Sequence, residues 1–328
     1  MSKKFILNSD DFGVSSASNR AVEEAYQYNL LKSVSLTPNG SAFNDAINII
    51  TQKMPDIGVG VHLNLTEGKS LCSDVNLLTN SEMQFNNSYL TLLIKICNPK
   101  EKDLLPQIER EFRRQIETVM AKTKVSHIDS HSHIHSIPPI FNMVCRLAKE
   151  YKIPYVRTHF EKFYFVPEII RHMHWSFYKN LVKKLILNFF TIINENTIHK
   201  YKLKTNDYLI GISYGLKMDA IAVAYGIKAI KGDNITVEAF IHPHRYEEGT
   251  IDDYFCEYLI TRNKKLSEKL INSGYDITNY FECSAEAEAK EESQTETQEE
   301  PQSESQSEIQ EETRNEIQPE TEQESPEQ

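Results

Sequence analysis

The sequence predicts an α/β protein built on a mainly parallel sheet or barrel. Over the first 283 residues, short apolar, β-prone runs alternate with longer segments of helical periodicity, which is typical of βαβ units. About seven such strands can be counted. Five of them are followed by an aspartate, histidine or arginine suited to metal or acid–base work. In parallel α/β folds such groups gather at the carboxyl ends of the strands.

The individual elements follow from these patterns. Strands are predicted at 5–7, 33–36, 57–65, 126–129, 155–157, 208–212 and 235–241. Helices are predicted at 15–30, 42–53, 104–122, 139–151, 218–227 and 252–273. Serine and asparagine caps favour the first helix, and a proline near its start favours the fourth. Gly274 is expected to end the last helix in a left-handed conformation.

Two segments interrupt this alternation. Residues 160–205 are aromatic and basic, and we expect a helical insertion or lid on the domain formed by residues 1–283. Residues 284–328 contain 16 Glu and no Asp against Lys290 and Arg314, a net charge of −14. This Glu-, Gln- and Ser-rich tail has too few apolar side chains to offset the entropy of ordering, so we expect it to be disordered.

Composition excludes several classes of protein. The chain has 328 residues and a net charge of −11, so the part before the tail carries only +3 and is not a strongly basic nucleic-acid binder. No apolar run approaches the roughly 18 residues of a membrane-spanning helix, and residues 5–7 are too short for a signal-peptide core. Five scattered cysteines without CxxC spacing indicate reduced thiols and a cytoplasmic protein.

Candidate ligands follow the first and third strands. Asp10 and Asp11 come directly after the first strand, and His62 lies near the end of the third. Alone, the two aspartates fit a turn before Phe12 and Gly13, and a single histidine on an apolar strand is usually a satisfied core residue. Only their combination with further histidines favours a functional site.

A histidine cluster follows the fourth strand. Four histidines fall within nine positions: His127, His131, His133 and His135. A histidine-rich surface loop is the alternative, but this density favours a metal site. In an extended segment the last three would point to one side; in a loop they need not, so three ligands from this segment are not required.

These residue types suit metal-assisted hydrolysis. One carboxylate and two imidazoles can hold a divalent ion and leave positions open, and such an ion lowers the pKa of bound water and polarises a carbonyl. Asp10 and Asp11 supply two carboxylates, one to ligate and one to act as base. His242, after the last strand, is the candidate proton donor, placed beyond the ligands because the ion would repel a protonated imidazole.

Five motifs together carry a family resemblance. They are NSDDFG at 8–13, SVSL at 33–36 with Asn39, GVHLNLT at 60–66, HIDSHSHIH at 127–135 and IHP at 241–243. With them, the chain resembles the YdjC-like carbohydrate deacetylase family, which includes the ChbG and HpnK proteins, from residue 3 to about 280. The resemblance implies an irregular seven-stranded (β/α) barrel similar to NodB-like polysaccharide deacetylases. It implies removal of an N-acetyl group from an acetylated amino sugar or short oligosaccharide, by a homodimer.

The resemblance also implies roles for individual residues. Asp11, His62 and His131 resemble the metal ligands, Asp10 the general base and His242 the histidine acid. One divalent ion is implied, most often Mg²⁺, although two imidazoles also suit Zn²⁺ or Co²⁺.

Three further residues match the family pattern less closely. Arg157 matches an arginine near the site that could orient a carboxylate, and His133 and His135 match positions that support the site or face the substrate. The chain departs from the family pattern at Ser132, at His244 and in the length of its insertion.

Two other functions compete with the deacetylase. A non-catalytic protein of the same fold would bind a sugar or a partner and use the tail for recruitment. A metal-dependent phosphoesterase would also use aspartates and histidines, although it usually takes two metals and more carboxylates than this chain groups together.

Overall fold

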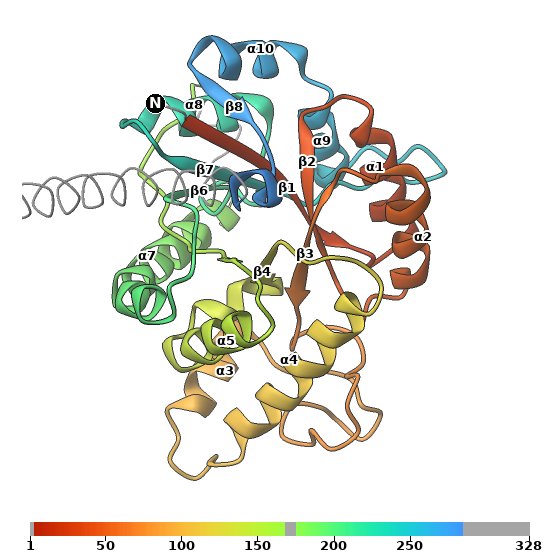
Figure 1. Ribbon diagram of the computed structural model, residues 1–328, viewed down its shortest axis with the longest axis vertical. Helices are drawn as coiled ribbons and strands as arrows, with labels where there is room; N and C mark the ends of the chain where they lie inside the picture. The colour runs from red at the N-terminus through yellow and green to blue at the C-terminus, as the bar shows by residue number, and fades with distance from the viewer. Residues whose placement is uncertain (1–2, 168–174, 285–328) are drawn as a thin grey trace, which may run out of the picture. The chain divides into compact units, whose positions relative to one another are not determined.

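The computed structural model describes residues 3–167 and 175–284, which form one parallel sheet surrounded by helices (Figure 1). The strands are β1 (Lys3–Phe12), β2 (Leu31–Leu36), β3 (Gly58–Leu63), β4 (His127–Ser130), β5 (Tyr155–Val156), β6 (Tyr208–Ile210), β7 (Thr236–Ile241) and β8 (Tyr275–Ile277). All seven predicted strands are present, and β8 is added to them.

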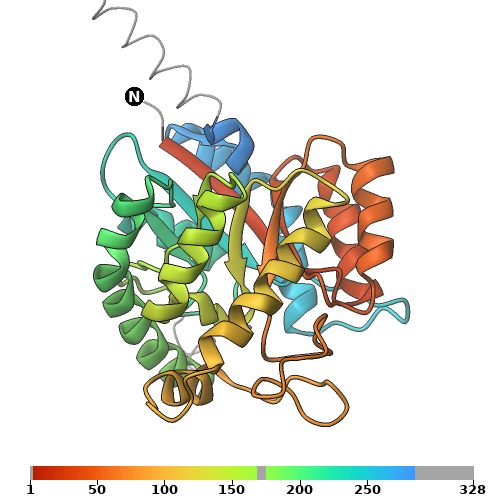
Figure 2. The ribbon, with the colours of Figure 1, turned by 60° about the horizontal axis from the view of Figure 1, so that its bottom comes forward.

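Helices follow most strands, as the alternating pattern predicts. They are α1 (Ser16–Tyr26), α2 (Phe43–Lys53), α3 (Tyr89–Ile96), α4 (Leu104–Met120), α5 (Pro138–Glu150), α7 (Trp175–Tyr201), α8 (Ala220–Ala229), α9 (Asp253–Thr261) and α10 (Lys264–Asn272), with the short 3₁₀ helix η1 (His131–Ser136). In Figure 2, α4 and α5 lie in front of the strands and α1 and α2 pack together on the right.

The strand order explains how distant parts of the sequence meet. It runs β5-β4-β3-β2-β1-β7-β6, these strands pair in parallel, and β8 joins β1, also in parallel. The sheet curls: the Val156 N–H donates to Lys204 O over 3.1 Å, and the Leu209 N–H donates to Phe160 O over 2.9 Å. Backbone flanking the two end strands is therefore joined, and the carboxyl ends of the strands face a common centre.

The core comes from apolar strands and from one apolar stripe per helix. Phe5, Val34 and Ile128 are buried in the sheet. In α4 the buried apolar positions recur every three or four residues, as a helix packed on one face requires: Leu104, Ile108, Phe112, Ile116 and Val119. Each fully buried aliphatic or aromatic side chain stabilises the fold by roughly 1.5–3 kcal/mol.

The structure differs from the predicted elements in three places. Residues 252–273 form two helices, because the Asn263 side chain accepts the Leu266 N–H over 2.9 Å and caps a new helix there. Helix α3 is not predicted from the sequence; its start is fixed by a capping box between Ser88 and Thr91. The histidine cluster is not extended, because η1 contains Ser132 at φ 54°. Gly274 has φ 79°, as its capping role requires.

The predicted insertion contains the longest helix of the described residues, the 27-residue α7, which packs on α5. Its buried side chains are partly polar: the Asn194 side chain donates to Ser136 O over 2.8 Å, and the Lys184 ammonium donates to Lys162 O over 2.8 Å. These bonds attach α7 to the domain although its sequence shows little apolar periodicity.

Residues 1–281 form one compact unit, and a second begins at Glu282. The tail predicted to be disordered lies, from residue 285 on, outside the described residues. Among the described helices, none combines the length and apolar character needed to cross a bilayer.

Candidate active site

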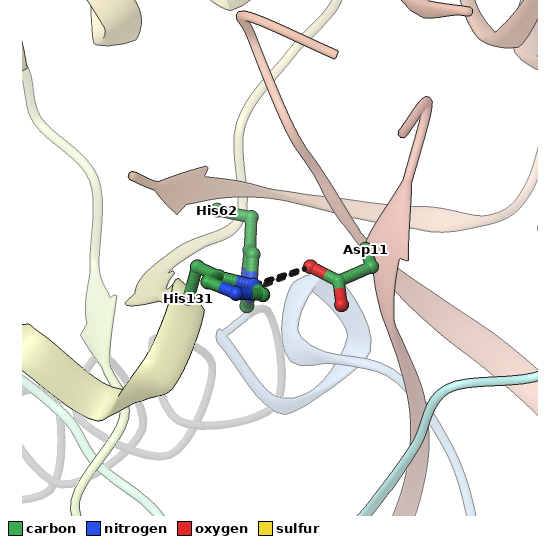
Figure 3. A group of neighbouring side chains, drawn as sticks. All are labelled: Asp11, His62 and His131. Atoms are coloured by element: carbon green, nitrogen blue, oxygen red, sulfur yellow. Dashed lines mark hydrogen bonds and ion pairs between the residues drawn. The ribbon is translucent and has the colours of Figure 1, made fainter. Parts of the chain in front are cut away.

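Three side chains from three strand ends converge at the carboxyl edge of the sheet (Figure 3). Asp11 comes from β1, His62 from β3 and His131 from the start of η1. Asp11 Oδ1 lies 2.9 Å from His131 Nδ1 and 3.3 Å from His62 Nε2. One ligand atom from each of the three lies within 4.8 Å of the others. The structure thus gathers one carboxylate and two imidazoles around one point.

A bulge in β1 aims the two neighbouring aspartates into one cavity. The register of β1 with β2 shifts between Ser9 and Phe12, and Asp11 has φ 58°, a left-handed conformation that non-glycine residues rarely adopt. The Ser18 hydroxyl holds this backbone by donating to Asp11 O over 2.9 Å. Such strain typically costs about 1–3 kcal/mol and collects at functional sites.

His62 is held by a carboxylate on its far side. Asp129, its neighbour across the β3–β4 pairing, lies with Oδ1 2.8 Å from His62 Nδ1. The Ser35 hydroxyl donates to the other Asp129 oxygen over 2.7 Å. Burial lowers the pKa of His62, but Asp129 and Asp11 outweigh it and raise the pKa to about 10. Asp129 thereby fixes the ring so that Nε2 faces Asp11.

His131 and Asp11 stabilise each other as an ion pair. Burial lowers the pKa of His131, but Asp11 and Glu67 raise it to about 9. Burial would raise the pKa of Asp11, but His131 and His62 hold it well below its ordinary value. Without an ion, the carboxylates therefore favour a proton on each imidazole, and a divalent cation that binds here has to displace those protons.

Asp10 has different partners from Asp11. Both of its oxygens accept from the Arg157 guanidinium over 2.7 Å, and the Asn8 amide donates to Oδ1 over 2.7 Å. Asp10 is almost fully buried yet lines the same cavity as Asp11. Two hydrogen bonds in one plane leave Asp10 little freedom to turn.

Arg157 is a structural partner of carboxylates. Its side chain is 0% exposed and also pairs with Asp129 at 2.7 Å and with Glu238. It therefore orients a carboxylate, Asp10, from behind the cavity.

His242 lies on the opposite side of the cavity, after β7. Its backbone N–H donates to Glu257 Oε2 over 2.5 Å, and its Nδ1 lies 3.4 Å from the same oxygen. Burial lowers the pKa of His242, but the Glu257 carboxylate outweighs it, and the pKa is raised. This raised pKa favours a protonated imidazole that can donate a proton.

The two remaining histidines of the predicted site, His133 and His135, lie in different surroundings. His133 lines the cavity, and no described group bonds to its Nδ1. His135 is fully buried, with Nδ1 2.5 Å from Ser130 Oγ and Nε2 3.0 Å from Arg157 O. His135 therefore supports the site, because both ring nitrogens hold the backbone around Ser130 and Arg157 in place.

The cavity encloses about 270 Å³, near the lower end of the roughly 300–1,000 Å³ of typical ligand pockets. Several of its residues and supports are not predicted from the sequence: Glu67, Lys183, Glu238, Tyr254 and Glu257. Glu238 did carry a signal, since a glutamate inside the apolar run ITVEAFI requires a buried partner. No sequence pattern marks Lys183, because only folding brings helix α7 next to the cavity.

The donor set fits a divalent metal ion. Asp11, His62 and His131 offer the carboxylate and imidazole ligands that such ions take, and a carboxylate behind a ligating histidine is the usual support. A second group, Asp10, His62 and Asp129, is also close enough. However, the Arg157 guanidinium already pairs with both of its carboxylates, which disfavours a second ion there.

A curled parallel sheet with an Asp–His–His cluster at its carboxyl edge defines an α/β protein with a candidate metal site. The sequence assigns the chain to a narrower group of proteins. Residues 4–295 match the family model of YdjC-like proteins, so the chain belongs to the YdjC-like family. That the chain resembles this family is thereby confirmed.

Curated relatives of this chain share a name. Proteins called carbohydrate deacetylase are 38% identical over 152 residues in Brevibacillus brevis, 35% over 152 in Clostridium beijerinckii and 35% over 158 in Halalkalibacterium halodurans. These alignments cover 46–48% of this chain and 58–64% of each relative. The chain therefore matches about three-fifths of the length of these relatives.

A solved structure supports the fold. It belongs to a protein of Enterococcus faecalis V583 provisionally described as a cellobiose-phosphate cleavage protein, and superposes with a TM-score of 0.66 at 19% identity. The match covers 86% of this chain and 99% of that one.

Proposed function

We propose that this protein is a metal-dependent hydrolase that removes an N-acetyl group from an acetylated amino sugar or short oligosaccharide. The observation that carries the proposal is the Asp11, His62 and His131 cluster, in one cavity with a second carboxylate and a histidine on the far side. The shared name of the curated relatives supports the substrate class.

Asp11, His62 and His131 would hold the ion, and family resemblance favours Mg²⁺, with Zn²⁺ and Co²⁺ as alternatives. A bound divalent ion would lower the pKa of a water molecule and polarise the amide carbonyl. Asp129 keeps His62 oriented for this role through the 2.8 Å contact with Nδ1.

Asp10 is suited to accept the proton of the attacking water. It lines the cavity beside Asp11, and its paired contacts with Arg157 hold the carboxylate in one orientation. A general base of this kind typically contributes about 10²–10⁴-fold to the rate.

His242 is suited to donate a proton to the departing amine nitrogen. It lies on the other side of the cavity, and Glu257 raises its pKa. Protonating this nitrogen as the C–N bond breaks releases a neutral amine, so the reaction yields acetate and the free amino sugar.

Phosphoester hydrolysis is less well supported. Two-metal sites use shared carboxylates, and here Arg157 takes the oxygens that a second ion would need. The non-catalytic alternative does not account for a carboxylate, Asp10, and an imidazole, His242, that line the same cavity.

Acetate release tests the proposal. Metal-stripped full-length protein is assayed with acetylated mono- and disaccharides, before and after addition of Mg²⁺, Zn²⁺ or Co²⁺. We expect metal-dependent acetate release that is lost in Asp10→Asn. A protein that binds these sugars but releases no acetate with any ion would be a binding protein.

A further inference from the structure

An apolar groove opens beside the catalytic cavity, between α3 and α7. It encloses about 650 Å³, more than twice the volume of the cavity itself. Its walls carry five large apolar or aromatic side chains: Tyr89, Leu90, Leu93, Val182 and Ile186. A groove of this size and composition can enclose a chain of many methylene groups.

The groove is continuous with the catalytic cavity. Glu67, Ser132, Asn180 and Lys183 line both. Ser132 directly follows the candidate ligand His131, so the groove begins one residue from the proposed metal site. A substrate whose acetamido group reaches that site can therefore extend into the groove without leaving the protein surface.

The groove walls expose apolar side chains that the fold does not cover. In the described structure Leu90 of α3 is 62% exposed and Val182 of α7 is 58% exposed. Lys184, also in α7, is 1% exposed. Helix α7 thus exposes apolar side chains such as Val182 although it also buries apolar Leu187 and Ile198. Exposed apolar patches beside a binding cavity mark surfaces that bind apolar groups.

The lining of the catalytic cavity is more polar than the lining of the groove. On the cavity side lie Asp10, Asp11 and His133, and on the groove side lie Leu90, Leu93 and Ile186. Such a division fits one molecule with a polar head and an apolar tail.

We infer that the substrate is amphiphilic: an acetylated amino sugar with an apolar aglycone, which the α3–α7 groove binds while the sugar occupies the catalytic cavity. This inference rests on the proposed function. Continuity of the two cavities favours the substrate itself as occupant over a separate partner, because any molecule in the groove contacts the residues that bound the catalytic cavity.

The probes are methyl and octyl β-glycosides of N-acetylglucosamine, used below the micelle concentration of the octyl compound. The full-length, metal-loaded protein is titrated with each by calorimetry, and acetate release is measured in parallel. Since each buried methylene contributes about 0.8 kcal/mol, burial of only two favours the octyl glycoside by at least about tenfold in affinity. We expect the advantage in KM, with kcat little changed.

Matched serine variants locate the effect. Val182→Ser and Leu90→Ser alter opposite walls of the groove and should bring the octyl-to-methyl affinity ratio toward one. Leu185→Ser is the control, because Leu185 lies on the same helix, is 51% exposed and does not line the groove. It should keep the wild-type ratio.

The outcomes separate this inference from the proposed function. An octyl preference that Val182→Ser abolishes supports the groove even if neither glycoside releases acetate, in which case the proposed hydrolysis fails. A ratio near one in the wild type overturns the inference, even where acetate is released. If the groove variants instead change the oligomeric state measured by light scattering, the groove is an interface between copies of this chain and the inference is also overturned.

Discussion

Asp10 and Asp11 are neighbours in the chain, but the structure gives their carboxylates different partners. Asp11 contacts the two histidines of the cluster, whereas Asp10 is paired with Arg157. The left-handed backbone at Asp11 nevertheless lets both carboxylates reach one cavity, because an unbroken strand would send consecutive side chains to opposite faces.

This division predicts different defects in two conservative variants. Asp11→Asn removes a ligand charge and should weaken metal affinity. Asp10→Asn should keep the metal but lower turnover by about 10²–10⁴-fold, the range for a general base. Elemental analysis and acetate release on the same preparations distinguish them. Equal loss of metal in both variants would contradict the assignment.

The contact between Glu257 and His242 predicts how the reaction rate depends on pH. As the proton donor, His242 is active when protonated, so the rate should fall as pH rises through its raised pKa. Glu257→Gln keeps an acceptor for the His242 N–H but removes the charge, which lowers the pKa of His242. The basic limb of the kcat/KM profile should therefore move to lower pH. A limb that stays in place while the rate drops at every pH would show that Glu257 has only a structural role.

At the scale of the elements, the sequence predicted the strands well and the connections less well. All seven predicted strands are present, most of them as runs rich in β-prone apolar residues, as in ITVEAFI. Helix α3 and the break at Asn263 were not predicted, since one short capping interaction fixes each. The turn at Ser132 depends on tertiary contacts that no local pattern reveals.

At the site, too, the strand ends could be predicted from the sequence, whereas the contacts between distant residues could not. The pattern of strand ends brings the two aspartates, His62 and His131 to one edge of the sheet, and the family resemblance singles out Asp11, His62 and His131 as the ligands. Contacts across the curled sheet, such as that of Arg157 with Glu238, could not be predicted without the strand order.

The pairing of β3 with β4 predicts a steric requirement at Gly60. A Cβ built there would lie 2.3 Å from His127 Nε2, and the His127 ring is buried and bonded to Ser35 and Ser126. Gly60→Ala should therefore destabilise the protein by about 1–3 kcal/mol, the usual cost of overpacking. Denaturant unfolding measures this loss.

The control is a double-mutant cycle. His127→Ala removes the obstructing ring, so the Gly60→Ala/His127→Ala protein should lose less stability than the sum of the single losses. Additive losses would mean that the ring does not limit the space at Gly60.

At the scale of the whole molecule, the charge of the chain is concentrated in the tail. Residues 284–328 carry −14, and residues 285–328 lie outside the described structure. The attraction of their glutamates for cations is screened over about 8 Å at physiological salt. A chain ended after Cys283 should therefore keep its unfolding midpoint, metal content and turnover, while its isoelectric point rises. A large fall in turnover with unchanged folding would show that the tail reaches the site.

The central claim is that Asp11, His62 and His131 hold one divalent ion on which acetate release depends. The most direct test is to strip the full-length protein and His131→Ala of metal, reload both by dialysis, and measure bound ion and acetate release on the same samples. The account predicts one ion per wild-type chain, little or none in His131→Ala, and acetate release that follows the bound ion. Equal occupancy in the two proteins, or unchanged acetate release from the stripped wild type, would contradict it.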